Sequence, residues 1–290
     1  MAYYSYRLAG FLAPLVPPRI GYWFCVRLGD ILYTFSRKSR RNVWENMSHV
    51  LGEGADESAI ERAVRGIFRN TLKNYYDLFR TATLEGAEIE AMVQELHGSE
   101  HIGQAISTGK GVILSSAHFG NWEVMLQLAA SRFKSIVLPV EPLKHDKLFQ
   151  YICRLRARQG AQLVSVGRPL LSVFRALRQG GVVATAADRD ITNSGIEIEF
   201  FGAPAILPDG HVQLALRTGA QLILAFGRRL PNDKFEIHIE PPLALERTGD
   251  LKRDVRVNVE KVARILERYI SMSPEQWTML QPVWKGQAIR

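Results

Sequence analysis

The chain has few cysteines and lacks the common nucleotide and hydrolase motifs. Cys25 and Cys153 are its two cysteines, too few for a disulfide framework and not spaced as zinc ligands, which suits a reducing compartment. There is no Walker loop, no G-x-G-x-x-G fingerprint and no G-x-S-x-G elbow, which argues against P-loop, dinucleotide-fingerprint and α/β-hydrolase sites. The histidines show no metal-ligand spacing, so we expect no metal site.

A long uninterrupted apolar run is also missing. Residues 8–35 are rich in apolar and aromatic side chains, but prolines and charges break them before the roughly 18 residues that a spanning helix needs. They also argue against a cleaved signal peptide. Residues 20–35 predict an amphipathic helix, and the basic cluster 37–41 follows it. This fits a helix lying on an anionic membrane; a helix packed on the core before a solvated loop fits equally well.

The composition is that of a globular protein with excess positive charge. Of the 290 residues, 47% are hydrophobic and 23% charged, and the net charge is +8. An anionic partner is therefore expected: a membrane, a nucleic acid or a phosphorylated substrate. Because the basic residues are scattered and not interleaved with aromatics, we do not expect nucleic-acid binding.

The order of apolar runs predicts an α/β fold with a mostly parallel central sheet flanked by helices. We expect one domain over 1–290, with a helical region at 1–100 packed on an α/β core at 101–290. The strands are expected at 111–116, 135–140, 162–166, 181–187, 196–201, 221–227 and 235–240, and the helices of the core at 121–132, 144–158, 169–179, 209–218 and 254–271.

A histidine and a carboxylate stand where the first of these strands ends. His118 and Glu123 are five positions apart, with Gly120 and Asn121 as turn or N-cap residues between them. The side chains converge only if His118 lies in the loop and Glu123 in the first helical turn. Such a pair acts as a general base with an orienting carboxylate. On spacing alone, a loop histidine and an ordinary acidic residue at a helix N-terminus fit equally well.

A second charged group, Asp188-Arg189-Asp190, follows the strand at 181–187. It fits a charged turn, a phosphate clamp made by Arg189, or a metal site made by the two aspartates. Arg217 adds positive charge further on, with solvated surface as its alternative. Since no nucleophile is presented beside His118, the base is expected to activate a hydroxyl of the substrate.

Several segments together resemble the lysophospholipid acyltransferase superfamily, and more closely its bacterial lipid A acyltransferase branch, near the phosphatidylinositol mannoside acyltransferases. Residues 116–123 resemble the His-x4-Asp/Glu box. The similar segments further along the chain are Ala187-Asp188-Arg189-Asp190, Phe200-Phe201-Gly202, Leu207-Pro208-x-Gly210 and Ser273-Pro274-Glu275-Gln276-Trp277. The likeness runs from about residue 20 to 284.

The resemblance implies transfer of a fatty acyl chain from a thioester donor, acyl-CoA or acyl carrier protein, to a hydroxyl of a glycolipid or lysophospholipid, with no further cofactor. It implies that His118 is the base and that Glu123 or, alternatively, Glu199 (or Glu197) orients it. Arg189, Asn121, Asp188 and Arg217 are then expected to bind substrate. A peripheral enzyme on the cytoplasmic face of the inner membrane is expected.

Two other functions fit the sequence alone. One is a metal-dependent glycosyltransferase that uses Asp188 and Asp190. The other is a non-catalytic protein that binds anionic lipid through its basic N-terminal region.

Overall fold

A seven-stranded sheet forms the centre of the protein. The computed structural model describes residues 2–133, 135–166, 171–192 and 194–284. The strand order is β1-β9-β8-β2-β5-β3-β4. Neighbours run parallel except β8 and β9, which pair antiparallel, so the predicted mostly parallel α/β fold is confirmed. The strands are β1 (Val93–His97), β2 (Val112–Ser116), β3 (Ile136–Val140), β4 (Gln162–Ser165), β5 (Val182–Ala186), β8 (Gln221–Arg229) and β9 (Phe235–Ile239).

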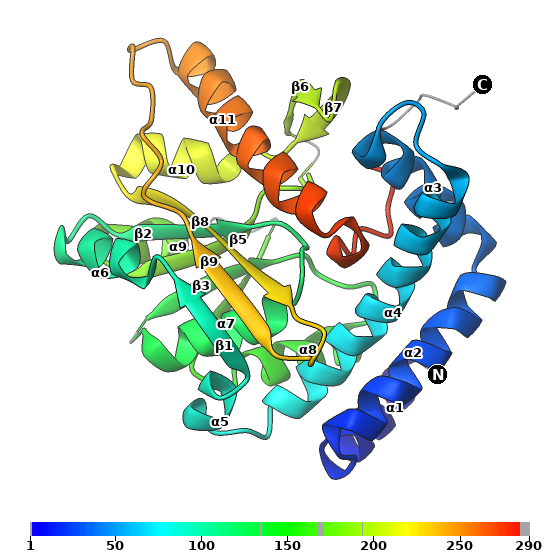
Figure 1. Ribbon diagram of the computed structural model, residues 1–290. Helices are drawn as coiled ribbons and strands as arrows, with labels where there is room; N and C mark the ends of the chain where they lie inside the picture. The colour runs from blue at the N-terminus through cyan, green and yellow to red at the C-terminus, as the bar shows by residue number, and fades with distance from the viewer. Residues whose placement is uncertain (1, 134, 167–170, 193, 285–290) are drawn as a thin grey trace.

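Helices cover both faces of the sheet (Figure 1). Successive strand residues point to opposite faces, so Ile113 and Val183 pack in one core while Val112 and Val182 pack in the other. The first core lies under α9 (Leu171–Arg178), α10 (Gly210–Thr218) and α11 (Leu251–Met272). The second lies under α6 (Ser99–Ser107), α7 (Trp122–Arg132) and α8 (Asp146–Arg156). Burial on both faces explains why the central strands read as continuous apolar runs.

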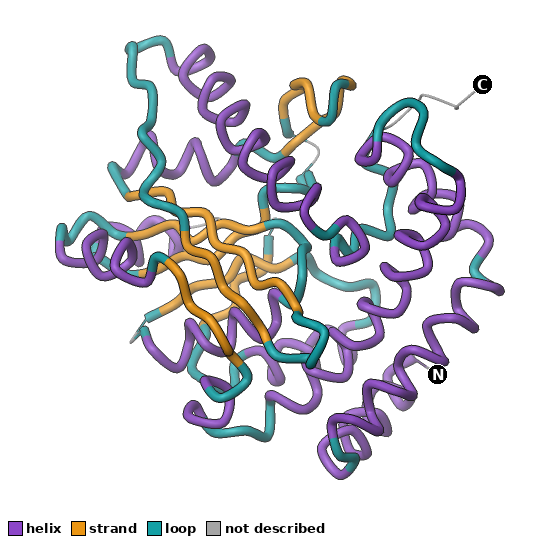
Figure 2. The backbone as a smooth tube through the Cα atoms, in the orientation of Figure 1, coloured by secondary structure: helices purple, strands orange, loops and turns teal. Residues whose placement is uncertain are grey.

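The N-terminal region is a group of helices beside the sheet (Figure 2). It contains α1 (Ala2–Leu12), a 3₁₀ turn (Ala13–Leu15), α2 (Pro18–Phe35), α3 (Arg37–Leu51), α4 (Glu57–Thr81) and α5 (Gly86–Glu90). The long helix α4 contacts α1, α2, α3 and α7, and its Val64, Ile67 and Phe68 belong to the larger core. This continuous packing holds α4 against the sheet. None of the helices in the described residues is long and apolar enough to cross a bilayer.

Two predictions about strands were incomplete. The N-terminal hundred residues are not all helical, because β1 is an edge strand; its Gln-Glu-Leu-His sequence carries helix-forming residues, and pairing with β9 overrides that preference. The strand expected at 196–201 forms β6 (Ile196–Phe200), which pairs with β7 (Ala203–Leu207) in a separate two-stranded hairpin. Of the helix expected at 169–179, residues 169–170 lie outside the described residues.

Candidate active site

The parallel pairing of β2 and β5 brings His118 and Asp188 together. Ser116 pairs with Ala186 at the ends of these strands, and each of the two functional residues stands two positions further along its chain. Nδ1 of His118 lies 2.8 Å from Oδ1 of Asp188, and the backbone N–H of His118 donates to Oδ2 at 2.7 Å. The site thus lies at the carboxyl ends of adjacent strands, where open α/β folds bind their ligands.

The charge of Asp188 determines the protonation of the pair. Burial alone lowers the pKa of His118, but the charge of Asp188 and its hydrogen bond outweigh burial and raise the pKa above its usual value. Burial raises the pKa of Asp188, yet the bonds from His118 and Trp277 keep the pKa of this carboxyl below its usual range. An ionised carboxylate only accepts hydrogen bonds, so Nδ1 of His118 carries the proton and Nε2 of the neutral ring has a free lone pair.

The His118 ring is accessible whereas its partner is not. The His118 side chain is 29% exposed and that of Asp188 is 0% exposed. Within the described residues Nε2 makes no hydrogen bond, and no serine or cysteine is bonded to the ring. Trp122 meets the ring edge-on at 6.3 Å between centroids, and the Arg156 guanidinium lies 4.3 Å over the Trp122 ring. Both Arg156 and Arg189 lower the pKa of His118 through their charge, but by less than the Asp188 carboxylate raises it, so two cationic side chains act on the ring beside one dominant anion.

The segment 273–278 completes the site from the far end of the chain. The buried Trp277 donates from Nε1 to Oδ2 of Asp188 at 2.8 Å. Thr278 donates from its backbone N–H and its hydroxyl to the carbonyl of His118, at 2.8 and 3.0 Å. Trp277 of the Pro-Glu-Gln-Trp motif and the following Thr278 therefore hold the two members of the pair.

The loop after His118 makes a backbone contact that requires glycine. Gly120 has a φ of +59°, and a Cβ atom there would stand 1.6 Å from the carbonyl oxygen of Gly227. The next residue, Asn121, donates its N–H to the same carbonyl at 3.2 Å. Asn74 of α4 holds the loop from the other side, donating to the Gly120 carbonyl at 2.6 Å. Gly120 thus lets the loop lie against β8.

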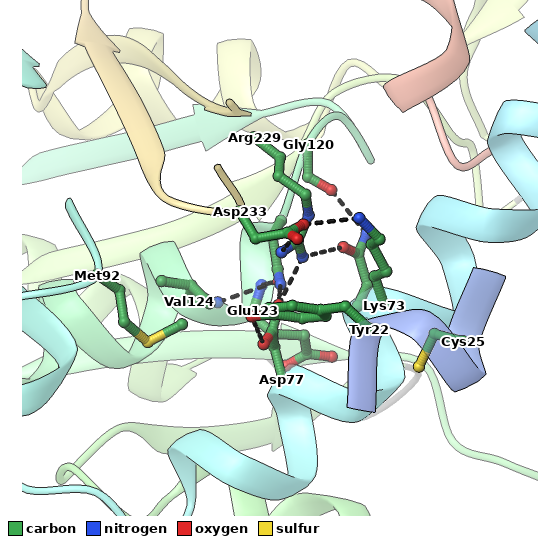
Figure 3. A network of polar contacts seen from close by, with 12 residues as sticks. Tyr22, Cys25, Lys73, Asp77, Met92, Gly120, Glu123, Val124, Arg229 and Asp233 are labelled. Atoms are coloured by element: carbon green, nitrogen blue, oxygen red, sulfur yellow. Dashed lines mark hydrogen bonds and ion pairs between the residues drawn. The ribbon is translucent and has the colours of Figure 1, made fainter. Parts of the chain in front are cut away.

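A buried polar network lies beneath this loop (Figure 3). Asp77 of α4 accepts from Tyr22 at 2.7 Å and Asn121 at 2.7 Å, and forms an ion pair with Arg229 at 2.5 Å. The side-chain oxygen of Asn121 in turn accepts from the N–H groups of Glu123 and Val124 and so caps α7. Asn121 is fully buried. The network connects α2, α4, α7 and β8, and Asn121 acts within it as a structural residue.

The expected contacts of Glu123 and Glu199 with His118 are not formed. The buried Glu123 forms a bidentate ion pair with Arg156 of α8, at 2.6 and 3.0 Å. Glu199 is 62% exposed and pairs with Arg264 on α11 at 3.2 Å. The five-residue spacing did bring Glu123 into the first turn of α7, but a buried carboxylate is most stable beside a cation, and Arg156 supplies one. The partner of His118 is Asp188.

Other predicted residues are placed differently. Arg189 pairs with Glu141 at 2.9 Å, and its side chain is 29% exposed. Like His118, it lies at the carboxyl ends of the strands. Asp190 closes its own turn by accepting from Thr192 and Gly195. Arg217 donates to Gln213 in the last turn of α10. Because β8 begins just after α10, Arg217 lies at the amino ends of the parallel strands, opposite to the carboxyl ends that carry His118. The structure does not bring Arg217 to His118.

The sequence alone gave no structural role to Asp77, Arg229 or Trp277. Asp77 had a usable signal, since it is a carboxylate within the apolar stripe of a helix, where an uncompensated charge is costly. Arg229 is the last residue of β8, whose central residues 222–226 are apolar. Nothing in the spacing shows that these two residues meet, because they are 152 positions apart.

The comparisons with known proteins agree with the motifs. Residues 2–286 match the family model described as bacterial lipid A biosynthesis acyltransferase. The phosphatidylinositol mannoside acyltransferases of two Mycobacterium tuberculosis strains are each 29% identical over 217 residues, which is 72% of this chain and 66% of theirs, just under two thirds. That of Mycolicibacterium smegmatis is 23% identical over 243 residues, 82% of this chain and 77% of its own. The chain belongs to the bacterial lipid A biosynthesis acyltransferase family.

Proposed function

We propose that this protein transfers a fatty acyl chain from a thioester donor, acyl-CoA or acyl carrier protein, to a hydroxyl of a glycolipid or lysophospholipid. The observation that carries the proposal is the His118–Asp188 pair, in which Nδ1 is occupied and Nε2 is free on an accessible ring. The family supports acyl transfer as the reaction class. With no nucleophile bonded to His118 in the described residues, direct attack by the acceptor fits better than an acyl-enzyme.

The chemistry follows from this geometry. Nε2 of His118 takes the proton of the acceptor hydroxyl while the oxygen attacks the thioester carbonyl. The Asp188 carboxylate stabilises the resulting imidazolium. When the tetrahedral intermediate collapses, the carbon–sulfur bond breaks and the thiolate leaves, taking the proton from Nε2. The products are the ester and the free thiol, and His118 is neutral again. General-base help of this kind contributes roughly 10²–10⁴ in rate.

Two cationic side chains near His118 suit an anionic substrate. Arg189 and Arg156 both act on the ring through their charge. Arg189 is partly exposed and its ion pair with Glu141 involves a carboxylate that is itself 43% exposed, so a phosphate can compete for the guanidinium. We assign Arg189 to the phosphate of the acceptor lipid or of the donor.

We propose that the N-terminal helices place the site at an anionic membrane. Both α1 and α2 pack on α4 and still expose a set of large apolar side chains: Tyr4, Leu8, Phe11, Leu12, Ile20, Trp23, Phe24, Leu28, Ile31, Leu32 and Phe35. Residues 37–41 at the start of α3 add Arg and Lys. Apolar and aromatic side chains next to a basic cluster are the signature of a peripheral interfacial helix. We place the protein on the cytoplasmic face of the inner membrane, where acyl thioesters are made.

The two alternative functions have less support. A metal-dependent glycosyltransferase needs free aspartates, but Asp188 is bonded to His118 and Trp277, and Asp190 holds its own turn. A non-catalytic lipid-binding function does not explain why His118 is held by Asp188 with Nε2 free.

Mass spectrometry of membrane lipids tests the proposal. Cells lacking the protein should lose one acylated glycolipid or lysophospholipid product, and the wild-type chain should restore it. His118→Gln should not restore it, whereas His145→Gln, a substitution of an exposed histidine on α8's N-cap, should. Full restoration by His118→Gln would reject the mechanism, and unchanged lipids in the deleted strain would favour the non-catalytic reading.

A further inference from the structure

Two histidines and two glutamates form a cluster on the strands β1 and β9, which lie side by side at one edge of the sheet (Figure 1). The parallel register pairs Glu95 with Glu236 and His97 with His238. Residues two apart on a strand point to the same face, so all four side chains share one face. The two imidazole rings stack with their centroids 4.7 Å apart. None of these residues belongs to the candidate active site.

The distances between the histidine nitrogens and the carboxylate oxygens are close to those of a tetrahedral metal site. Zinc binds imidazole nitrogen and carboxylate oxygen at about 2.0–2.2 Å, so two of its ligands in a tetrahedron lie roughly 3.3–3.5 Å apart. Oε1 of Glu236 lies 3.1 Å from Nε2 of His238 and 3.5 Å from Nε2 of His97. The ligand atoms of these residues all lie within 4.8 Å of one another. Oε2 of Glu95 lies 3.3 Å from Nε2 of His97.

Glu236 is already oriented for this role. Arg228 donates from Nε and a terminal nitrogen to Oε2 of Glu236, at 2.9 and 2.5 Å. This leaves Oε1 as the oxygen that faces both histidines. In known metal sites, a ligand side chain is oriented by a hydrogen bond to the polar atom that does not bind the metal. The Glu236 side chain is 11% exposed, whereas those of His238 and His97 are 33% and 50% exposed, so an ion can enter from solvent.

We propose that His97, His238 and Glu236 bind a zinc ion, with Glu95 or a water molecule as the fourth ligand. Two imidazoles and a carboxylate favour zinc over magnesium or calcium, which prefer oxygen ligands. The bound ion joins the edge strand β1 to β9. The sequence does not reveal the site, because His97 on β1 is far in the chain from Glu236 and His238 on β9. Only the pairing of the two strands brings these residues together.

Zinc titration of the untagged, chelator-treated full-length protein tests the proposal. Calorimetry with zinc chloride should show one ion per chain with a Kd in the micromolar range or below. His97→Gln and His238→Gln should each weaken binding about 100-fold, and Arg228→Met about tenfold. His145→Gln is the matched control and should bind as the wild type does. At a hundredfold excess over Kd, zinc should raise the wild-type Tm by about 5 °C.

Cobalt provides a second readout of the ligands. Cobalt(II) should give the visible absorption of a tetrahedral site without thiolate charge transfer, which separates this site from Cys25 and Cys153. Circular dichroism confirms that each variant is folded. Absence of stoichiometric zinc binding, or equal binding by the wild type and both histidine variants, would overturn the proposal and leave the cluster as histidines paired with carboxylates.

Discussion

Nδ1 of His118 lies 2.8 Å from Oδ1 of Asp188, although the two residues are 70 positions apart in the chain. Paired residues of β2 and β5 are also 70 positions apart in the chain, from Val112 and Val182 to Ser116 and Ala186. The contact is therefore a direct continuation of the strand register beyond the ends of both strands. Two paired strands thus position both residues.

Replacing the carboxylate of Asp188 should abolish most of the activity. In Asp188→Asn the amide no longer stabilises the imidazolium, and its N–H₂ group donates a hydrogen bond to Nδ1, so the proton of the neutral ring moves to Nε2. We expect kcat to fall by about 10²–10⁴ with the fold retained. The measurement is acyl transfer under single-turnover conditions, with circular dichroism as the control. Asp190→Asn is the matched substitution and should retain most activity; the reverse order of effects would exclude the pair.

The raised pKa of His118 predicts an acid limb in the rate profile. The base works only when neutral, so kcat/KM should fall as pH drops through the pKa of His118, which lies above its usual value of 6.5. Without the Asp188 charge, burial and the charges of Arg189 and Arg156 all lower the pKa of the ring. The residual activity of Asp188→Asn should therefore show its acid limb at lower pH than the wild type. A limb that does not move would mean that another group titrates.

The hydrogen bond from Trp277 should contribute to rate rather than to binding. Trp277→Phe keeps an aromatic ring in the core but removes the donor to Oδ2 of Asp188, a charge-assisted bond of about 1.5–3 kcal/mol. We expect kcat to fall about tenfold with KM nearly unchanged. Trp284→Phe is the control, since Trp284 is equally buried but donates to the Phe200 carbonyl. Equal losses in both variants would point to general packing.

Glu123 and Glu199 should respond in different ways. Glu199→Gln breaks an exposed ion pair and should leave activity within about twofold and stability unchanged. Glu123→Gln leaves the largely buried Arg156 without its counter-charge, so the free energy of unfolding should fall by about 2 kcal/mol. Urea denaturation measures the second effect. If Glu199→Gln removed activity while the protein stayed folded, Glu199 would again be a candidate for the carboxylate that orients His118.

The contact between Gly120 and Gly227 should tolerate no side chain. Gly120→Ala forces the loop away from β8, and a displacement of about 1 Å at His118 costs roughly 10²-fold in rate. The strain of a positive φ acts as well. Gly109→Ala isolates that strain, because Gly109 has a φ of +69° and open space around its Cβ position. Activity assays should show a large loss for Gly120→Ala and little for Gly109→Ala.

The exposed apolar face of α2 should govern membrane binding. Trp23 and Phe35 are 53% and 78% exposed, and together they bury enough apolar surface in a bilayer to change partitioning tenfold or more. The double variant Trp23→Ser/Phe35→Ser should float less with vesicles containing anionic lipid. The matched control is Leu251→Ser/Met272→Ser, which alters two exposed apolar residues of α11. Equal flotation of both variants would contradict the proposed surface.

The sequence predicted the strands that carry the site but not the order in which the strands lie in the sheet. Alternating apolar runs placed the core strands within a few residues, and both His118 and Asp188 were recognised at strand ends. The order of strands in a sheet depends on non-local pairing, which local patterns do not encode. Glu123 was one candidate partner because it is near in the chain, whereas the register of β5 brings Asp188 closer. Trp277 was noticed only as part of a motif, since its contact spans 89 positions.

The bond from Trp277 to Asp188 also orders events during synthesis. A ribosome makes the chain from its N-terminus, so His118 and Asp188 emerge well before the residues that orient them. The helices and strands up to β9 can begin to fold while the proposed catalytic pair still lacks its last partners. A nascent chain therefore lacks the Trp277 and Thr278 contacts to this pair until residues 274–278 have been added, however much of its sheet has already formed.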